Sequence, residues 1–395
     1  MLSLIGGARF VQAAAPASAP VQPDAARVAP LLLVDPAQPP SFTLPVIDFN
    51  DQAQRQVVVD REPGQYLGHP STLLLEDGKT ILCVYPGGHG RGPLYYKRST
   101  DGGLTWSDRL PTPKNWESSQ ETPTLHRVVD AAGKKRVILF SGRFPVRLAV
   151  SEDDGATWSE LKPVGDWGGL VVMASVIALK TAPGRYLGLF HDDGHYLHAG
   201  GKATKISTVY KTLSNDGGLT WSEPVAILKS DKTFLCEPGA IRSPDGKQIA
   251  VLLRENFRVE NAHVIFSDDE GQTWTAPRPL AASLNGDRHT ARYAPDGRLF
   301  ISFRDVEVKG THSPTNGDWV GWIGKYDDLK QQGQGQYRIR FKKNYLTRDC
   351  AYPGVELLRD GTFVVTTYGH WIDREQPYIL SERFKMAELD AAAKR

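Results

Sequence analysis

Ionisable side chains recur in this chain where a strand-like apolar run ends, or in the loop that follows it. His89 comes after the run at 81–85, Asp192 follows the run at 186–190, and Arg254 follows the run at 249–253. A histidine or a carboxyl group can transfer a proton near neutral pH, and a guanidinium group binds carboxylates. These residue types predict acid–base chemistry in one funnel, provided that the fold gathers the strand ends. The whole set comprises His69, His89, Arg91, Arg143, His191, Asp192, Arg254 and Arg304.

One part of this set has the residue types of a metal site. His191 and His195 flank Asp192 and Asp193. Neighbouring residues of a strand point to opposite faces, however, and no cysteine or third histidine stands at ligand spacing. The sequence therefore predicts neither a metal site nor a cofactor.

The element that must position these groups is a repeat. The octapeptide Ser-x-Asp-x-Gly-x-Thr-Trp, which we call the box, starts at Ser99, Ser151, Ser214 and Ser267, with spacings of 52, 63 and 53 residues. Its Asp can accept backbone N–H bonds inside a turn, its Gly supplies a positive φ, and its Trp packs the turn onto its blade. We therefore interpret the box Asp residues as structural.

A second repeat extends the count to six. Apolar strand-like runs follow six turn glycines, which lie 55, 51, 62, 51 and 64 residues apart. Repeats of this length built from strands predict an all-β protein, a β-propeller of six four-stranded blades whose ring has no open sheet edge. A degenerate box is expected at 325–328, and the sixth unit has none. The turn glycines are Gly78, Gly133, Gly184, Gly246, Gly297 and Gly361.

Composition and the N-terminal segment limit the remaining possibilities. The 395 residues carry a net charge of +2, which gives no reason to expect nucleic acid or a membrane surface as partner. Residues 1–40, with a small-residue run and Ala/Pro-rich sequence, are expected to be a leader resembling a degenerate signal peptide, followed by the propeller over 41–395. A secreted or periplasmic protein is therefore expected. No later segment has eighteen consecutive apolar residues. The three cysteines are expected to be buried and unpaired.

Boxes of this form on a six-bladed ring resemble the sialidase (neuraminidase) superfamily over roughly residues 55–385. Cys236-Glu237-Pro238, followed by Arg254, is similar to the segment that carries the catalytic Glu and the second of three carboxylate-binding arginines. Ala351-Tyr352-Pro353-Gly354 is similar to the segment that carries the nucleophilic Tyr. The resemblance implies that Tyr352 is the nucleophile, Glu237 its base, and Arg254 a clamp for the substrate carboxylate.

The chain departs from that family at three places. The segment at 66–70, which contains His69, has no arginine where the family has its first one, and the next strand leads to His89 where the family has its acid Asp. Arg304 precedes the place at which the third arginine is usual. A histidine can still donate a proton, so His89 is one candidate acid and Asp192 the other. The candidate substrate-binding residues are Arg254, Arg304, Arg91, His69 and Arg143.

The resemblance implies an exo-glycosidase that hydrolyses a terminal anionic sugar, either sialic acid or a related nonulosonic or uronic acid, from a glycan or oligosaccharide. Two alternatives remain open. One is a histidine-based propeller glycosidase or lyase acting on uronate-containing polysaccharide. The other is a non-catalytic propeller that binds carbohydrate, although a pure scaffold need not concentrate ionisable groups at strand ends.

Overall fold

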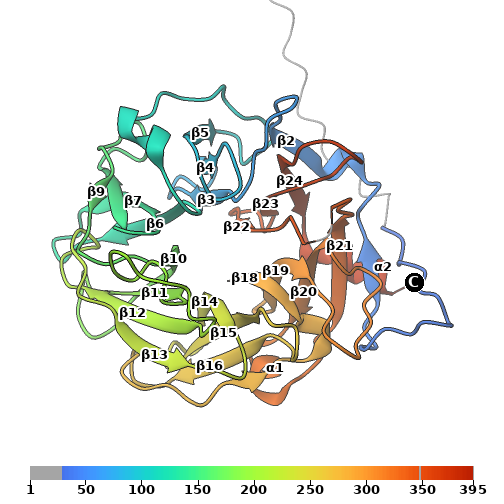
Figure 1. The fold of residues 1–395 in the computed structure, drawn as a ribbon. Helices are drawn as coiled ribbons and strands as arrows, with labels where there is room; N and C mark the ends of the chain where they lie inside the picture. The colour runs from blue at the N-terminus through green and yellow to red at the C-terminus, as the bar shows by residue number, and fades with distance from the viewer. Residues whose placement is uncertain (1–28, 347, 395) are drawn as a thin grey trace, which may run out of the picture.

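The computed structural model describes residues 29–346 and 348–394, which form six mainly antiparallel sheets arranged as blades around a central axis (Figure 1). The number of sheets equals the number of turn–strand units in the sequence. The predicted all-β, six-bladed propeller is therefore confirmed. The number of strands differs among the blades: blade 1 has three strands, blade 5 has five, and the others have four.

Within each blade the strands follow one another from the axis of the ring outward. Blade 1 comprises β3 (Ser71–Leu74), β4 (Ile81–Pro86) and β5 (Leu94–Ser99). Blade 2 comprises β6 (Thr124–Val129), β7 (Lys135–Ser141), β8 (Arg147–Ser151) and β9 (Lys162–Pro163). Blade 3 comprises β10 (Leu170–Ala178), β11 (Tyr186–Asp192), β12 (Thr208–Ser214) and β13 (Val225–Lys229).

The second half of the ring has the same order. Blade 4 comprises β14 (Leu235–Arg242), β15 (Ile249–Glu255), β16 (His263–Ser267) and β17 (Arg278–Pro279). Blade 5 comprises β18 (Gly286–Tyr293), β19 (Leu299–Asp305), β20 (Trp319–Gly324), β21 (Tyr337–Lys342) and β1 (Val46–Asp48). Blade 6 comprises β22 (Gly354–Leu357), β23 (Phe363–Gly369), β24 (Tyr378–Phe384) and β2 (Gln56–Asp60). Short 3-10 helices span Ala53–Arg55, Lys114–Ser118 and Ala282–Leu284.

Segments from both ends of the chain close the ring. The early strand β2 pairs antiparallel with β24, near the C-terminus, and so completes blade 6 (Figure 1). The strand β1 pairs parallel with β21 and adds the fifth strand of blade 5. The pairing between β2 and β24 ties the first part of the described chain to the last, which prevents blade 6 from separating from blade 1.

The apolar core lies between neighbouring blades. Every residue of β4, β11, β19 and β23 is buried. These strands occupy the middle of their blades and are covered on both faces, which explains why their sequences are continuous apolar runs rather than alternating patterns. One cluster shows the arrangement, since Leu252 of blade 4 packs with Phe303 and Trp322 of blade 5.

The four boxes form the turns that follow β5, β8, β12 and β16. In each box the Thr hydroxyl donates a 2.6 Å hydrogen bond to the Asp Oδ2. The Ser hydroxyl donates to Oδ1 of the same Asp at 2.8–2.9 Å. In blade 3 the Trp221 ring packs on Phe140 of blade 2, with ring centroids 5.6 Å apart, so the box Trp also joins two blades. The boxes lie at the end of the ring opposite to the start of the innermost strands.

A short helix replaces the box in the last two blades. Helix α1 (Tyr326–Gln331) follows β20, and α2 (Met386–Ala393) follows β24. The expectation of a degenerate box at 325–328 is wrong, because Asp328 instead accepts a 2.7 Å bond from the Lys325 backbone N–H at the start of α1. Glu388 accepts the equivalent bond from Lys385 in α2.

We expect Asp216→Ala to lower stability without changing catalysis. The carboxylate accepts bonds from the Ser214 hydroxyl, the Thr220 hydroxyl and the Thr220 N–H, so its loss should cost about 1–3 kcal/mol in the free energy of unfolding. Urea unfolding measures this loss, and turnover of the folded fraction should match that of the parent. A large loss of turnover at unchanged stability would contradict the structural role.

Three other expectations concern the chain as a whole. Cys83, Cys236 and Cys350 are buried and unpaired, as predicted. Within the described residues, no helix has the length and apolar character needed to cross a membrane. The leader expected at 1–40 falls largely on residues 1–28, outside the described part of the chain, so secretion or a periplasmic location stays a prediction.

Candidate active site

The backbone is kinked at the start of the innermost strand of every blade or just before it, at the end of the ring that we call the mouth. One residue other than glycine has a φ between +51° and +66° there in each blade. Such a backbone is uncommon and costs free energy, and it clusters at functional sites. In blades 3, 4 and 5 the strand register is interrupted at the same place. The six residues are His69, Glu121, Val171, Glu237, Arg288 and Ala351.

Tyr352 and Glu237 meet at the mouth although they come from blades 6 and 4. The Tyr352 hydroxyl donates a 2.5 Å hydrogen bond to Glu237 Oε1, and Arg254 Nη1 donates a 2.7 Å bond to the same oxygen. Burial by itself raises the pKa of Glu237, but the positive charge of Arg254 and the Tyr352 hydroxyl hold that pKa below its usual value. Burial, with the charge of Glu237, raises the pKa of Tyr352 well above its usual value. The resting site therefore holds a protonated phenol against an ionised carboxylate.

A buried carboxylate, Asp287, gathers three guanidinium groups behind this pair. Arg258 binds it with two bonds of 2.6 and 2.8 Å, Arg304 Nη2 approaches to 2.5 Å, and Arg254 Nε lies at 3.2 Å. Asp287 is 0% exposed, and burial would raise its pKa, but the three positive charges hold the pKa far below its usual range. Arg304, 3% exposed, also donates to two backbone carbonyls, so the protein itself engages its guanidinium group.

A second carboxylate, Asp349, organises the side of the mouth near blades 1 and 6. Its Oδ1 accepts hydrogen bonds from the Tyr66 hydroxyl at 2.8 Å and the Tyr368 hydroxyl at 3.0 Å. Its Oδ2 lies 3.0 Å from His370 Nε2, and His89 Nδ1 lies 3.3 Å from Oδ1. Burial would raise the pKa of Asp349, but its bonds from His370, His89 and Tyr66 hold that pKa far below its usual range.

The partners of His370 determine its charge. Its Nε2 faces the Asp349 carboxylate and its Nδ1 faces the carbonyl oxygen of Glu375 at 2.8 Å. Neither partner can donate, so both ring nitrogens must carry hydrogens and the ring is an imidazolium. Burial opposes this charge, but Asp349 and the Glu375 carbonyl raise the pKa of His370 above its usual value. His370 and Asp349 therefore form an ion pair.

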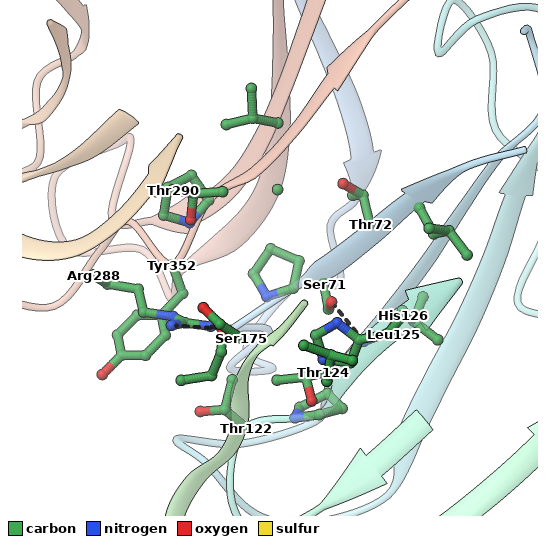
Figure 2. Close-up of a pocket in the computed structure, with 18 of the residues that line it drawn as sticks. Ser71, Thr72, Thr122, Thr124, Leu125, His126, Ser175, Arg288, Thr290 and Tyr352 are labelled. Atoms are coloured by element: carbon green, nitrogen blue, oxygen red, sulfur yellow. Dashed lines mark hydrogen bonds between the residues drawn. The ribbon is translucent and has the colours of Figure 1, made fainter. Parts of the chain in front are cut away.

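A cavity of about 150 Å³ lies at the mouth beside Tyr352 and Glu237. Tyr352 also lines a larger cavity of about 300 Å³, which continues along the axis between the innermost strands. Figure 2 shows this axial cavity with Tyr352 and Arg288 on one side of it and His126 on the other. The residues that line the smaller cavity at the mouth include His69, His89, Glu121, Val171, His191, Glu237 and Tyr352.

The structure brings several of the predicted site residues together. His69 and His89 are in edge contact, with ring centroids 4.6 Å apart, and His69 lies equally close to the Tyr352 ring. Burial lowers the pKa of His69 to about 3, so this histidine is neutral at neutral pH. His191 Nδ1 accepts a 3.3 Å bond from the Glu237 backbone N–H. Arg254 reaches Glu237 directly through its 2.7 Å bond.

Other predicted site residues have contacts that indicate structural roles. Some of these residues lie at the edge of the site. Asp192 is fully buried, and its carboxylate accepts bonds from three backbone N–H groups of its own loop. It does not line either of these two cavities, so its position does not suit the acid role predicted for it. Arg91 is exposed in the loop after His89. The Arg143 guanidinium lies over the Tyr196 ring at 5.2 Å.

Sequence reasoning missed several ionisable residues of this region, among them Glu121, Asp287, Arg288 and Asp349. One signal was available for Arg288, which lies nine residues before turn glycine Gly297, just as Glu237 lies nine before Gly246. Glu121 and Asp349 stand in connecting segments, each twelve residues before a turn glycine, Gly133 or Gly361, and the sialidase-like segments mark neither of them.

Comparisons with known proteins agree on the fold. Neither the protein-family models nor the curated proteins contain a match to this chain. A Dyadobacter fermentans protein of unknown function is 16% identical with a TM-score of 0.63, and the match covers 83% of this chain and 97% of that one. An α-L-arabinofuranosidase from Fusarium graminearum, solved with an iminosugar inhibitor, is 13% identical with a TM-score of 0.60, covering 85% and 99%. The NanB sialidase from Streptococcus pneumoniae is 11% identical with a TM-score of 0.58, covering 86% and 73%.

This chain therefore has the six-bladed propeller fold of sialidases and of an arabinofuranosidase. At these identities the likeness establishes the fold and does not establish the activity. The resemblance to the sialidase superfamily that the boxes predicted is confirmed at the level of the fold. The activity has to be argued from the groups at the mouth.

Proposed function

We propose that this protein is a glycoside hydrolase that releases a terminal anionic sugar, either a sialic acid or a related nonulosonic or uronic acid, from a glycan. The observation that carries the proposal is the 2.5 Å hydrogen bond from the Tyr352 hydroxyl to Glu237. An anomeric carbon that bears a carboxylate repels an anionic nucleophile. A neutral phenol avoids that repulsion, provided that a base removes its proton during the attack.

The proposed first step moves two protons and one sugar. The Tyr352 oxygen bonds to the anomeric carbon while its proton passes to Glu237 Oε1, and the glycosidic oxygen leaves with a proton from an acid. In the second step water attacks the anomeric carbon and gives a proton back to that acid. The bond from carbon to the Tyr352 oxygen breaks, and the phenol recovers its proton from Glu237. The net change is hydrolysis of one glycosidic bond.

The charges around the mouth support an anionic substrate. Arg254 contacts Glu237, and the Arg288 guanidinium carbon lies 5.8 Å from the centre of the Tyr352 ring. Burial raises the pKa of Glu121, which favours its uncharged form in the mouth cavity. The axial cavity that Tyr352 also lines has more arginines than carboxylates in its walls, and this excess of positive charge attracts an anion.

A neutral sugar is the second candidate, and two observations favour it. The segment at 66–70, which corresponds to the segment of the first arginine in the sialidase pattern, has no arginine, and its His69 is neutral and 3% exposed. Asp287 and two backbone carbonyls engage Arg304, so this arginine is not free to bind a substrate carboxylate. A site with one partly exposed arginine in place of three suits a substrate whose anomeric carbon carries no charge.

Matched aryl glycosides distinguish these candidates. We expect the protein to hydrolyse an aryl sialoside or aryl uronide at least tenfold faster, in kcat/KM, than an arabinofuranoside or a rhamnoside with the same leaving group. The reverse preference would favour the neutral sugar. An ultraviolet-absorbing unsaturated product from a uronate polymer would identify a lyase, and no turnover with measurable sugar binding would identify a non-catalytic propeller.

A further inference from the structure

The mouth cavity contains a second carboxyl group to which the proposed mechanism has so far given no role. Glu121 lines it together with Tyr352, Glu237 and His89. We infer that Glu121 is the general acid of the proposed hydrolysis, the group that protonates the leaving oxygen. This inference rests on the proposed function and assigns a catalytic role to a residue that the boxes and the sialidase-like segments do not mark.

The chain builds a specific place for this side chain. Glu121 has a φ of +66°, and its backbone N–H donates a 2.7 Å bond to Gly90 O in the loop that carries His89. Its Oε2 accepts a 3.3 Å bond from the Val171 backbone N–H. A Cβ atom at Gly90 would lie 3.3 Å from Glu121 Oε1, and one at Gly142 would lie 2.9 Å from Glu121 Cβ. Glycines in two neighbouring loops therefore leave the room that the Glu121 side chain occupies.

The two glutamates of the cavity have pKa values displaced in opposite directions. Burial raises the pKa of Glu121, the charge of Glu237 adds to this shift, and the Val171 N–H and Arg143 oppose it. Arg254 and Tyr352 hold the pKa of Glu237 below its usual value despite burial. A pair of carboxyl groups separated in this way supplies an ionised base and a protonated acid at the same pH.

His89, one of the two candidate acids that the sequence suggested, is less well placed for that role. Its side chain is 65% exposed, and its Nδ1 lies 2.8 Å from the Tyr66 hydroxyl, which also donates to Asp349. A proton donor that faces bulk water gains little from the environment of the cavity. Glu121 lies beside the same loop, is less exposed than His89 and lines the cavity itself, which favours proton transfer to a bound leaving group.

The chemistry balances with Glu121 in this role. As the glycosidic C–O bond breaks, the Glu121 carboxyl gives its proton to the departing oxygen and becomes a carboxylate. In the second step the attacking water gives one proton to that carboxylate, and the remaining hydroxyl group stays on the anomeric carbon. Glu121 therefore ends the cycle protonated, ready for the next substrate.

Glu121→Gln tests the assignment through its dependence on the leaving group. We expect kcat to fall by about 100-fold or more on a substrate with an alkyl or sugar leaving group, which needs protonation. On a dinitrophenyl glycoside of the same sugar the loss should be less than tenfold. Glu117→Gln, an exposed glutamate on the preceding segment, is the matched control and should behave as the parent. Equal losses of kcat on both substrates in Glu121→Gln, or no loss on either, would overturn the assignment. If His89→Gln shows this leaving-group dependence and Glu121→Gln does not, His89 is the acid.

Two measurements extend the test. The kcat/KM of the parent should fall as pH rises through the raised pKa of Glu121, because the protonated form is required. This decrease should be absent from the pH profile of Glu121→Gln. Infrared difference spectra of the free protein, recorded over a pH titration, should show a protonated carboxyl band that persists above the usual titration range of a glutamic acid and that Glu121→Gln removes. Absence of that band overturns the assignment even if the protein is a hydrolase. If the band is present but the protein hydrolyses no glycoside, the proposed function is wrong.

Discussion

Tyr352→Phe is expected to reduce turnover by several orders of magnitude while the fold and the affinity for the sugar persist. The substitution removes one oxygen, the atom that donates the 2.5 Å bond to Glu237 and that forms the covalent bond in the proposed mechanism. The aromatic ring keeps its packing against His69 and Tyr368. Steady-state kinetics on the best aryl glycoside, with calorimetric binding of the released sugar, measure both quantities.

A covalent label supplies the independent check on Tyr352. A fluorinated sialic-acid-type inhibitor should modify Tyr352 in the parent protein, and peptide mass spectrometry should locate the adduct. Tyr368→Phe is the matched control, because it removes a hydroxyl that contacts Asp349 and His69 without touching Glu237. If Tyr352→Phe keeps near-full activity, the sialidase-type mechanism is wrong and a mechanism centred on His89 becomes the leading explanation.

Asp287→Asn is expected to have the largest effect on stability. The carboxylate is 0% exposed and is the shared partner of Arg254, Arg258 and Arg304. Its neutralisation leaves three guanidinium groups facing one another in a buried place, which should cost on the order of 3–5 kcal/mol in the free energy of unfolding. Urea unfolding at neutral pH measures this loss. Asp192→Asn is the control, because that buried carboxylate is held by backbone N–H groups and should cost less.

The pH dependence of the Asp287 effect follows from the direction of its pKa shift. The folded-state pKa lies below the unfolded value, so the carboxylate contributes its full stability above the ordinary carboxyl pKa of about 4. That contribution is lost as the pH falls toward the folded-state pKa. The gap in stability between parent and Asp287→Asn should therefore be widest near neutral pH and should narrow in acid. A gap that does not depend on pH would show that Asp287 acts through packing alone.

Most of the architecture could be predicted from local sequence. The box is a self-contained turn, because Ser214, Asp216 and Thr220 satisfy one another within seven residues. Six glycine turns followed by apolar runs set the number of blades, since each middle strand is covered on both faces. The strand number of each blade was less predictable. β1 and β2 join sheets formed mainly by residues far away in the chain, and a short helix can replace a box without a change in blade number.

The sequence by itself determined the repeat, the ring and one candidate catalytic pair, because Glu237 and Tyr352 stand in short segments whose neighbours are recognisable. Only the tertiary structure decided which charges meet at the mouth. Asp287, Asp349 and Glu121 come from three different blades or connections, and each acts through partners supplied by other blades or loops. Burial and the sign of the neighbouring charge set their protonation, and neither quantity exists until the ring closes. For that reason the candidate acids predicted from the sequence were His89 and Asp192, whereas the acid that we infer from the folded chain is Glu121.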